Sequence, residues 1–265
     1  MPVLAELPSF TLGLWGLATL LTLLLLGRMV AFEQYRDFPL FCAYLTANLL
    51  QTAVGVLLYQ GYGFTSSFSY QIAWTTQAFV VVARALAAAE VCYLVLGKYK
   101  GVWALATRIL SFCGLLVLGL ALYFGRNGYT VGITAMEIAL EACIATWVAG
   151  LFLFARYYNV RVLPVTGLLG LGIGLLSCFK ILNDLVFERF ARRYGDAWNH
   201  ASIGAFAGIL LIWIWAFRKS SVETVPEPRL RPSMVYASLI PQVNRQLAEL
   251  NEHLTQLWKL ESPKS

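Results

Sequence analysis

The sequence predicts an all-α membrane protein, a bundle of seven transmembrane helices followed by a short amphipathic helix. Its 265 residues are 59% hydrophobic and only 13% charged, whereas soluble domains carry about 25% charged residues. Apolar windows of about 20 residues, the length that crosses the hydrocarbon core as a helix, recur along residues 10–217. Much of the apolar surface is therefore expected to face lipid.

The apolar windows are separated by short polar connections, so consecutive helices are expected to run antiparallel. The predicted spans are Phe10–Leu26, Phe38–Tyr59, Tyr70–Leu96, Trp103–Tyr123, Val131–Phe154, Pro164–Phe187 and Ala201–Phe217. Together they define a membrane domain at residues 1–217.

The distribution of basic residues predicts the orientation of the bundle. Cytoplasmic loops are enriched in Lys and Arg. One set of connections, together with the tail, carries Arg28, Arg36, Lys98, Lys100, Arg156, Arg161, Arg218 and Lys219. The opposite loops carry few basic residues, apart from Arg126 and a dissenting cluster at Arg189, Arg192 and Arg193. The sequence thus favours a protein of the cytoplasmic membrane with its N-terminus outside and its C-terminus in the cytoplasm.

The composition of the chain changes from apolar to polar after the last predicted span. Residues 218–238 are polar and contain three prolines, which predicts a juxtamembrane linker. Residues 239–261 form an amphipathic, coiled-coil-like pattern with apolar residues alternately three and four apart: Ile240, Val243, Leu247, Leu250, Leu254 and Leu257. This seam could support a homodimer, dock on the membrane or bundle, or bind a cytoplasmic partner.

Seven ionisable residues lie inside the third to sixth windows, where charge is expensive. Arg84 and Glu90 are in the third, Arg108 in the fourth, Glu137 and Glu141 in the fifth, and Lys180 and Asp184 in the sixth. Matching depths at about 1.5 Å per residue predict an outer cluster of Glu137, Glu141, Lys180 and Asp184, with Arg84 as its innermost member, within reach of Glu141. Glu90 and Arg108 are expected to form an inner pair.

The second span adds a polar face next to these charges, with Asn48, Gln51 and Thr52 near its middle. A cluster with nearly equal numbers of positive and negative groups can serve one of two purposes. It can hold the bundle together, because an unpaired buried ion costs several kcal/mol, or it can form a site for a ligand or an ion. The sequence leaves both interpretations open.

Several other functions are disfavoured. The only histidines, His200 and His253, lie outside the predicted spans, and no HExxH, GxSxG or GxGD motif occurs, so we expect no enzyme. The five cysteines are scattered through apolar windows, so we expect no metal site and no disulfide framework. The seventh span has no lysine to hold retinal, and no other cofactor is predicted. No basic patch interleaved with aromatic residues suggests nucleic acid.

A loose motif connects the second and third spans. Arg36, Phe38 and Pro39 form an Arg-x-Phe-Pro sequence that opens the second helix, and Glu90 lies near the end of the third. In these features the chain resembles uncharacterised bacterial seven-helix membrane proteins. The resemblance implies the seven-helix fold and brings no activity with it.

The sequence therefore predicts a non-enzymatic sensor or accessory protein with a charged cluster inside the membrane. The alternative is a small-solute or ion-coupled transporter that uses the same cluster. Besides the lipid bilayer, the predicted partner is a second copy or a cytoplasmic protein bound through Ile240–Leu257.

Overall fold

The computed structural model of the protein is all-helical. It describes residues 9–62, 66–126, 128–158, 160–218 and 234–260, excluding the side chains of residues 9, 59, 184–199, 234–240 and 259–260. The structure is 92% helix, and its described residues contain no strand. The all-α part of the predicted fold class is confirmed.

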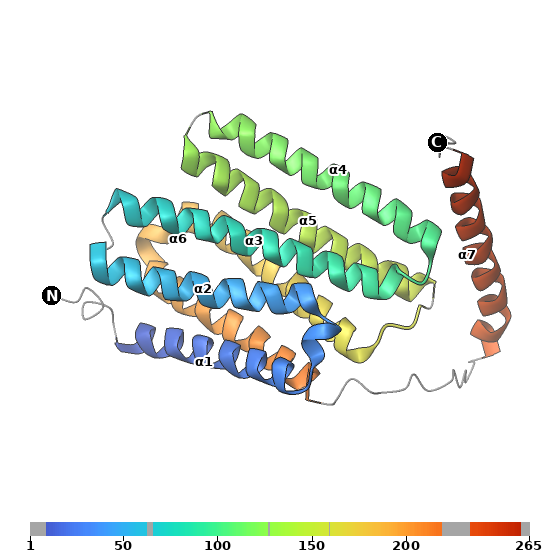
Figure 1. The fold of residues 1–265 in the computed structure, drawn as a ribbon, viewed down its shortest axis with the longest axis horizontal. Coiled ribbons are helices and arrows are strands. Elements are labelled where there is room, and N and C mark those ends of the chain that lie inside the picture. The colour runs from blue at the N-terminus through green and yellow to red at the C-terminus, as the bar shows by residue number, and fades with distance from the viewer. Residues whose placement is uncertain (1–8, 63–65, 127, 159, 219–233, 261–265) are drawn as a thin grey trace.

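In the described residues, seven α-helices and one short 3-10 helix follow one another. They are α1 (Ser9–Ala31), η2 (Gln34–Arg36), α2 (Pro39–Tyr62), α3 (Ser67–Leu96), α4 (Lys100–Gly125), α5 (Tyr129–Tyr157), α6 (Pro164–Ala216) and α7 (Met234–Leu260). Figure 1 shows α1 to α6 lying roughly side by side, with α7 at one end of the bundle next to the start of α4.

Six helical segments of the described chain are long and apolar enough to cross a membrane. They are Phe10–Ala31, Pro39–Tyr62, Ser67–Leu96, Lys100–Gly125, Tyr129–Tyr157 and Pro164–Asn183. His200–Ala216 is a shorter apolar helix. The structure therefore supports a membrane protein, and the count of seven spans stays a prediction.

The long helix α6 doubles back on itself. The indole nitrogen of Trp213 donates a hydrogen bond to the backbone oxygen of Leu169 at 3.4 Å. In a straight helix these residues would lie about 66 Å apart, at a rise of about 1.5 Å per residue. Ser202 likewise donates to the side-chain oxygen of Asn183 at 3.1 Å. α6 thus has a first arm, Pro164–Asn183, and an antiparallel second arm, His200–Ala216.

The second arm runs parallel to α1. At one end the hydroxyl of Thr11 is 2.9 Å from the ring nitrogen Nε2 of His200. At the other end the guanidinium of Arg28 donates to the backbone oxygens of Phe217 and Arg218 at 3.0 and 2.6 Å. The second arm therefore extends over the same depth of the bundle as α1.

The helix α3 lies at the centre of the bundle and α4 at its edge. In the most apolar window of α3, 56% of the residues are buried, against 11% in the corresponding window of α4. Figure 1 shows α4 at one edge of the bundle, beside α5. The outward face of α4 carries exposed apolar side chains such as Phe112, Leu115 and Leu122, as expected for a surface in contact with lipid.

The helix α7 packs against the beginning of α4. The backbone nitrogen of Gly101 donates to the side-chain oxygen of Asn251 at 2.8 Å, and the guanidinium carbon of Arg108 lies 3.4 Å from the centre of the Trp258 ring. The predicted apolar seam of α7 is only partly buried. Leu247 is buried, whereas Leu250 and Leu257 are 42% and 56% exposed.

The two arms of α6 approach closely at a glycine. Gly172 faces the indole nitrogen of Trp213, and a methyl group at this position would collide with it. Trp213 is fully buried between α6, Phe41 and Tyr44, so it has little freedom to move. Close packing of this kind requires a small residue, as in many membrane helix pairs.

We expect Gly172→Ala to destabilise the protein by about 1–3 kcal/mol, the usual effect of overpacking a dense core. The measurement is thermal or denaturant unfolding of the purified protein in detergent. Gly208→Ala is the matched control, because nothing lies within 4 Å of a Cβ added at Gly208. Equal stability of the two variants would contradict the packing of the two arms.

Candidate functional site

A buried ion pair joins the middle of α3 to α5. The Nη1 atom of Arg84 donates to Oε1 of Glu141, and the two side chains are 3% and 0% exposed. The aromatic ring of Tyr44 on α2 lies 5.5 Å from the guanidinium carbon of Arg84. Three helices therefore meet at Arg84, and its pairing with Glu141 agrees with the predicted match in depth.

A second polar chain lies on the same three helices. The side-chain amide of Gln51 on α2 donates to Gln77 of α3 at 2.7 Å. The amide nitrogen of Gln77 donates in turn to the carboxylate of Glu137 on α5 at 2.5 Å. The predicted polar residue Gln51 therefore reaches the predicted carboxylate Glu137 through Gln77, a link that the sequence analysis missed.

The predicted inner pair of Glu90 and Arg108 does not form. The two carboxylate oxygens of Glu90 accept hydrogen bonds from the backbone nitrogens of Leu40 and Phe41, at 3.0 and 2.9 Å. These are free N–H groups in the first turn of α2, where the helix dipole also favours a negative charge. Arg108 instead stacks on Trp258 of α7.

The contact of Glu90 gives the Arg-x-Phe-Pro sequence at Arg36–Pro39 a physical role. Pro39 begins α2, a position where the missing N–H of proline costs nothing. The next two N–H groups bind Glu90. The Phe-Pro sequence and Glu90 are thus the two halves of one contact between α2 and α3.

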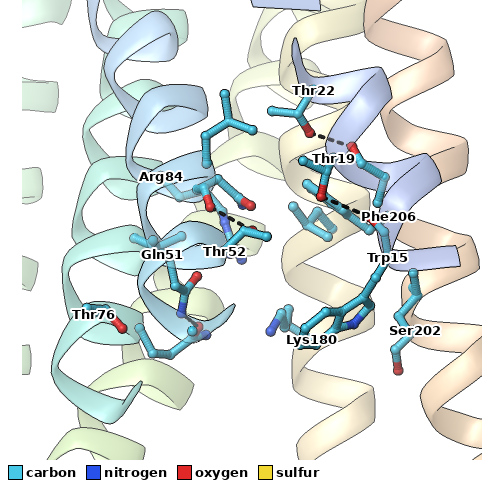
Figure 2. Close-up of a pocket in the computed structure, with 18 of the residues that line it drawn as sticks. Trp15, Thr19, Thr22, Gln51, Thr52, Thr76, Arg84, Lys180, Ser202 and Phe206 are labelled. Atoms are coloured by element: carbon cyan, nitrogen blue, oxygen red, sulfur yellow. Dashed lines mark hydrogen bonds between the residues drawn. The ribbon is translucent and has the colours of Figure 1, made fainter. Parts of the chain in front are cut away.

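A cavity of 660 Å³ opens beside these contacts, between α1, α2, α3 and both arms of α6. Figure 2 shows Thr76, Gln51, Thr52 and Arg84 on one side and Trp15, Thr19, Thr22, Ser202 and Phe206 on the other, with Lys180 between them. The predicted polar face of α2 (Asn48, Gln51 and Thr52) lies on the wall. The sequence analysis missed the contribution of α1, although two threonines three residues apart in an apolar span signal it.

Lys180 is half-buried and lines the cavity. Within the part of the chain that the structure describes, it makes no ion pair and no hydrogen bond. The prediction that Lys180 joins the carboxylates of Glu137 and Glu141 in one cluster is therefore wrong, because each of them has a nearer partner on α3. The side chain of Asp184, the fifth predicted member, lies outside the described residues.

The cavity supplies a few polar groups among mostly apolar walls. Every hydroxyl on the lining has a partner: Thr19, Thr22, Thr52 and Thr76 donate to backbone oxygens of their own helices, and Ser202 donates to Asn183. The described lining contains no histidine, cysteine or carboxylate, and the described residues contain no group of three or more potential metal ligands. The arrangement is suited to binding and offers no nucleophile paired with a base.

Comparison with protein families, with curated proteins and with solved structures finds no match to this chain.

We expect Arg84→Met to destabilise the protein by about 3–5 kcal/mol, because it leaves the carboxylate of Glu141 buried without its partner. Glu141→Gln should be destabilising too, and the double variant should recover much of the loss. Unfolding of the four proteins in detergent forms a thermodynamic cycle that isolates the coupling energy. Lys180→Met is the control: it should change stability little and show no coupling to Glu141→Gln, and strong coupling there would contradict the assigned pairs.

Proposed function

We propose that this protein is a non-enzymatic sensor or accessory protein of the bacterial cytoplasmic membrane, which binds a small molecule in the cavity between α1, α2, α3 and α6. The cavity is the observation that supports this function. Sites for small organic ligands enclose about 300–1,000 Å³ and combine apolar walls with a few polar groups. The cavity of 660 Å³ falls within this range and has such walls.

The helix α3 offers a route from the cavity to the rest of the bundle. It lines the cavity from Ala73 to Arg84, and less than two turns later Glu90 holds the start of α2. A ligand that favours one position of α3 would bias these contacts, since ligands shift populations between pre-existing states. Output would pass to a second copy or a cytoplasmic partner through Ile240–Leu257, where Leu250 and Leu257 remain exposed on α7.

Transport is the second candidate function, and the shape of α6 favours it. Both antiparallel arms line the cavity, with Lys180 on the first and Ser202 and Phe206 on the second. Substrate sites of transporters lie between packed helices, as this cavity does. A transporter would move its ligand across a vesicle membrane, whereas a sensor would bind it without flux.

We further propose that His200–Ala216 is a seventh span. Because Thr11 lies beside His200 and Arg28 beside Phe217, this arm covers a depth of about 26 Å that α1 also covers. The α1–α2, α3–α4 and α5–α6 connections lie at one end of the bundle in Figure 1. These connections and the helix ends beside them carry six basic residues, against four in the opposite loops, which supports placing this end and the C-terminus in the cytoplasm.

The number of spans decides whether the two termini lie on the same side of the membrane. With seven spans, a reporter that fluoresces only in the cytoplasm should be active when fused after Ser265. A reporter that is active only outside the membrane should work at the N-terminus. Six spans would put both termini on one side, so the pair of fusions distinguishes the two counts.

We expect the protein purified in mild detergent to carry a small molecule that native mass spectrometry detects as an added mass. Ala73→Phe places a ring in the cavity and should remove the added mass. Ala53→Phe makes the same change at an exposed position of α2 and should retain it. A wild-type protein free of any added mass, or equal occupancy in the two variants, would argue against ligand binding.

A further inference from the structure

We infer that the ligand of this cavity is an amphipathic organic anion, whose carboxylate pairs with Lys180 while its apolar part packs against Trp15, Phe179 and Phe206. This inference rests on the proposed function, because it assigns the chemical class of the molecule that the cavity binds. Three features of the described residues support it: the charge on the lining, the hydrogen-bonding state of the hydroxyl groups and the composition of the walls.

The charge on the lining is positive. Arg84 and Lys180 are the ionisable residues on the described wall. Arg84 is neutralised from behind by Glu141 on α5, which leaves Lys180 as the cation without a described partner. An ammonium group within apolar helices is stabilised by an opposite charge at hydrogen-bonding distance. An anionic ligand provides that charge, whereas a cationic ligand would meet repulsion and a neutral ligand would leave the ammonium without a partner among the described residues.

The hydroxyl groups strengthen the choice of an anion at Lys180. Since the lining hydroxyls already donate to other acceptors, they offer lone pairs to the cavity more readily than protons. The three N–H groups of a lysine side chain donate and cannot accept. Lys180 is thus the group on this wall best able to bind an oxyanion, and it lies between the two sides of the cavity (Figure 2).

The walls determine the rest of the ligand. Beyond the polar groups, the lining consists of apolar and aromatic side chains, namely Trp15, Leu49, Leu58, Val80, Leu176, Phe179, Ile203 and Phe206 together with small residues. Burying an apolar chain or ring against such surfaces is favourable by about 25 cal/mol per Å². A small inorganic anion would leave most of this surface unused, so the ligand carries an apolar part.

An amphipathic carboxylate can reach the cavity from two sources, the surrounding water or the bilayer. Both present the same group to Lys180. The experiment is a thermal-unfolding titration of the full chain in phosphatidylcholine nanodiscs, with phenylacetate added from water and palmitate incorporated in the bilayer. Decanoate and its neutral analogue decanamide form the pair that isolates the charge.

We expect decanoate to raise the melting temperature in a saturable way and decanamide to leave it unchanged. Lys180→Met should weaken the apparent affinity for decanoate at least tenfold, and Lys180→Arg should retain most of it. Lys98→Met is the matched control, because Lys98 is exposed outside the cavity, and it should bind like the wild type. A stronger response to palmitate assigns the ligand to the bilayer, and a stronger response to phenylacetate assigns it to the water.

Equal shifts with decanoate and decanamide, or full binding by Lys180→Met, would overturn the assignment of an anion. If no carboxylate binds but the purified protein carries a neutral added mass that Ala73→Phe removes, the cavity is a ligand site of another class. The inference is then wrong and the proposed function stands. If no carboxylate binds and no added mass is found, both are wrong.

Discussion

An ionised side chain inside an apolar bundle needs a partner, and this constraint organises the middle of the protein. Removing one partner from a buried ion pair generally costs about 3–5 kcal/mol, an appreciable part of the stability of a domain. Arg84 has its partner in Glu141, and Glu90 has its partners in two backbone nitrogens of α2. Each solution joins α3 to another helix, so the charges fix how the helices pack.

The central position of α3 follows from these contacts. Gln77 and Arg84 lie seven residues apart, two helical turns, and so project from the same face of α3, where both meet α5. Six residues further along, Glu90 turns to α2. The helix α4 offers no comparable group to the core, since Arg108 stacks on Trp258 of α7. Arg108 therefore links α4 to α7 at the edge of the bundle.

The helical spans and one of the charge pairs could be predicted from the sequence, because they depend on composition and on depth in the membrane. The pairs that depend on the direction in which a side chain points could not. The apolar windows correspond closely to α1 to α5 and to the first arm of α6, and Arg84 pairs with Glu141 as their depths suggested. Depth also matched Glu90 with Arg108, but it does not reveal helix rotation or acceptors in the backbone. The N–H groups that bind Glu90 belong to the backbone, so only Pro39 indicates them in the sequence. Lys180 was predicted to join Glu137 and Glu141 because it lies at the same depth, but both carboxylates face α3.

The contrast between Arg84 and Lys180 separates a structural charge from one that is available for binding. A planar guanidinium with several donors suits a permanent pair in the interior, and Arg84 is only 2% exposed beside Glu141. Lys180 carries its charge on a flexible stem at the wall of an open cavity, with no bond to the described residues. A methionine would fill the same volume without desolvating a charge. A lysine at this position is therefore what the proposed anionic ligand requires.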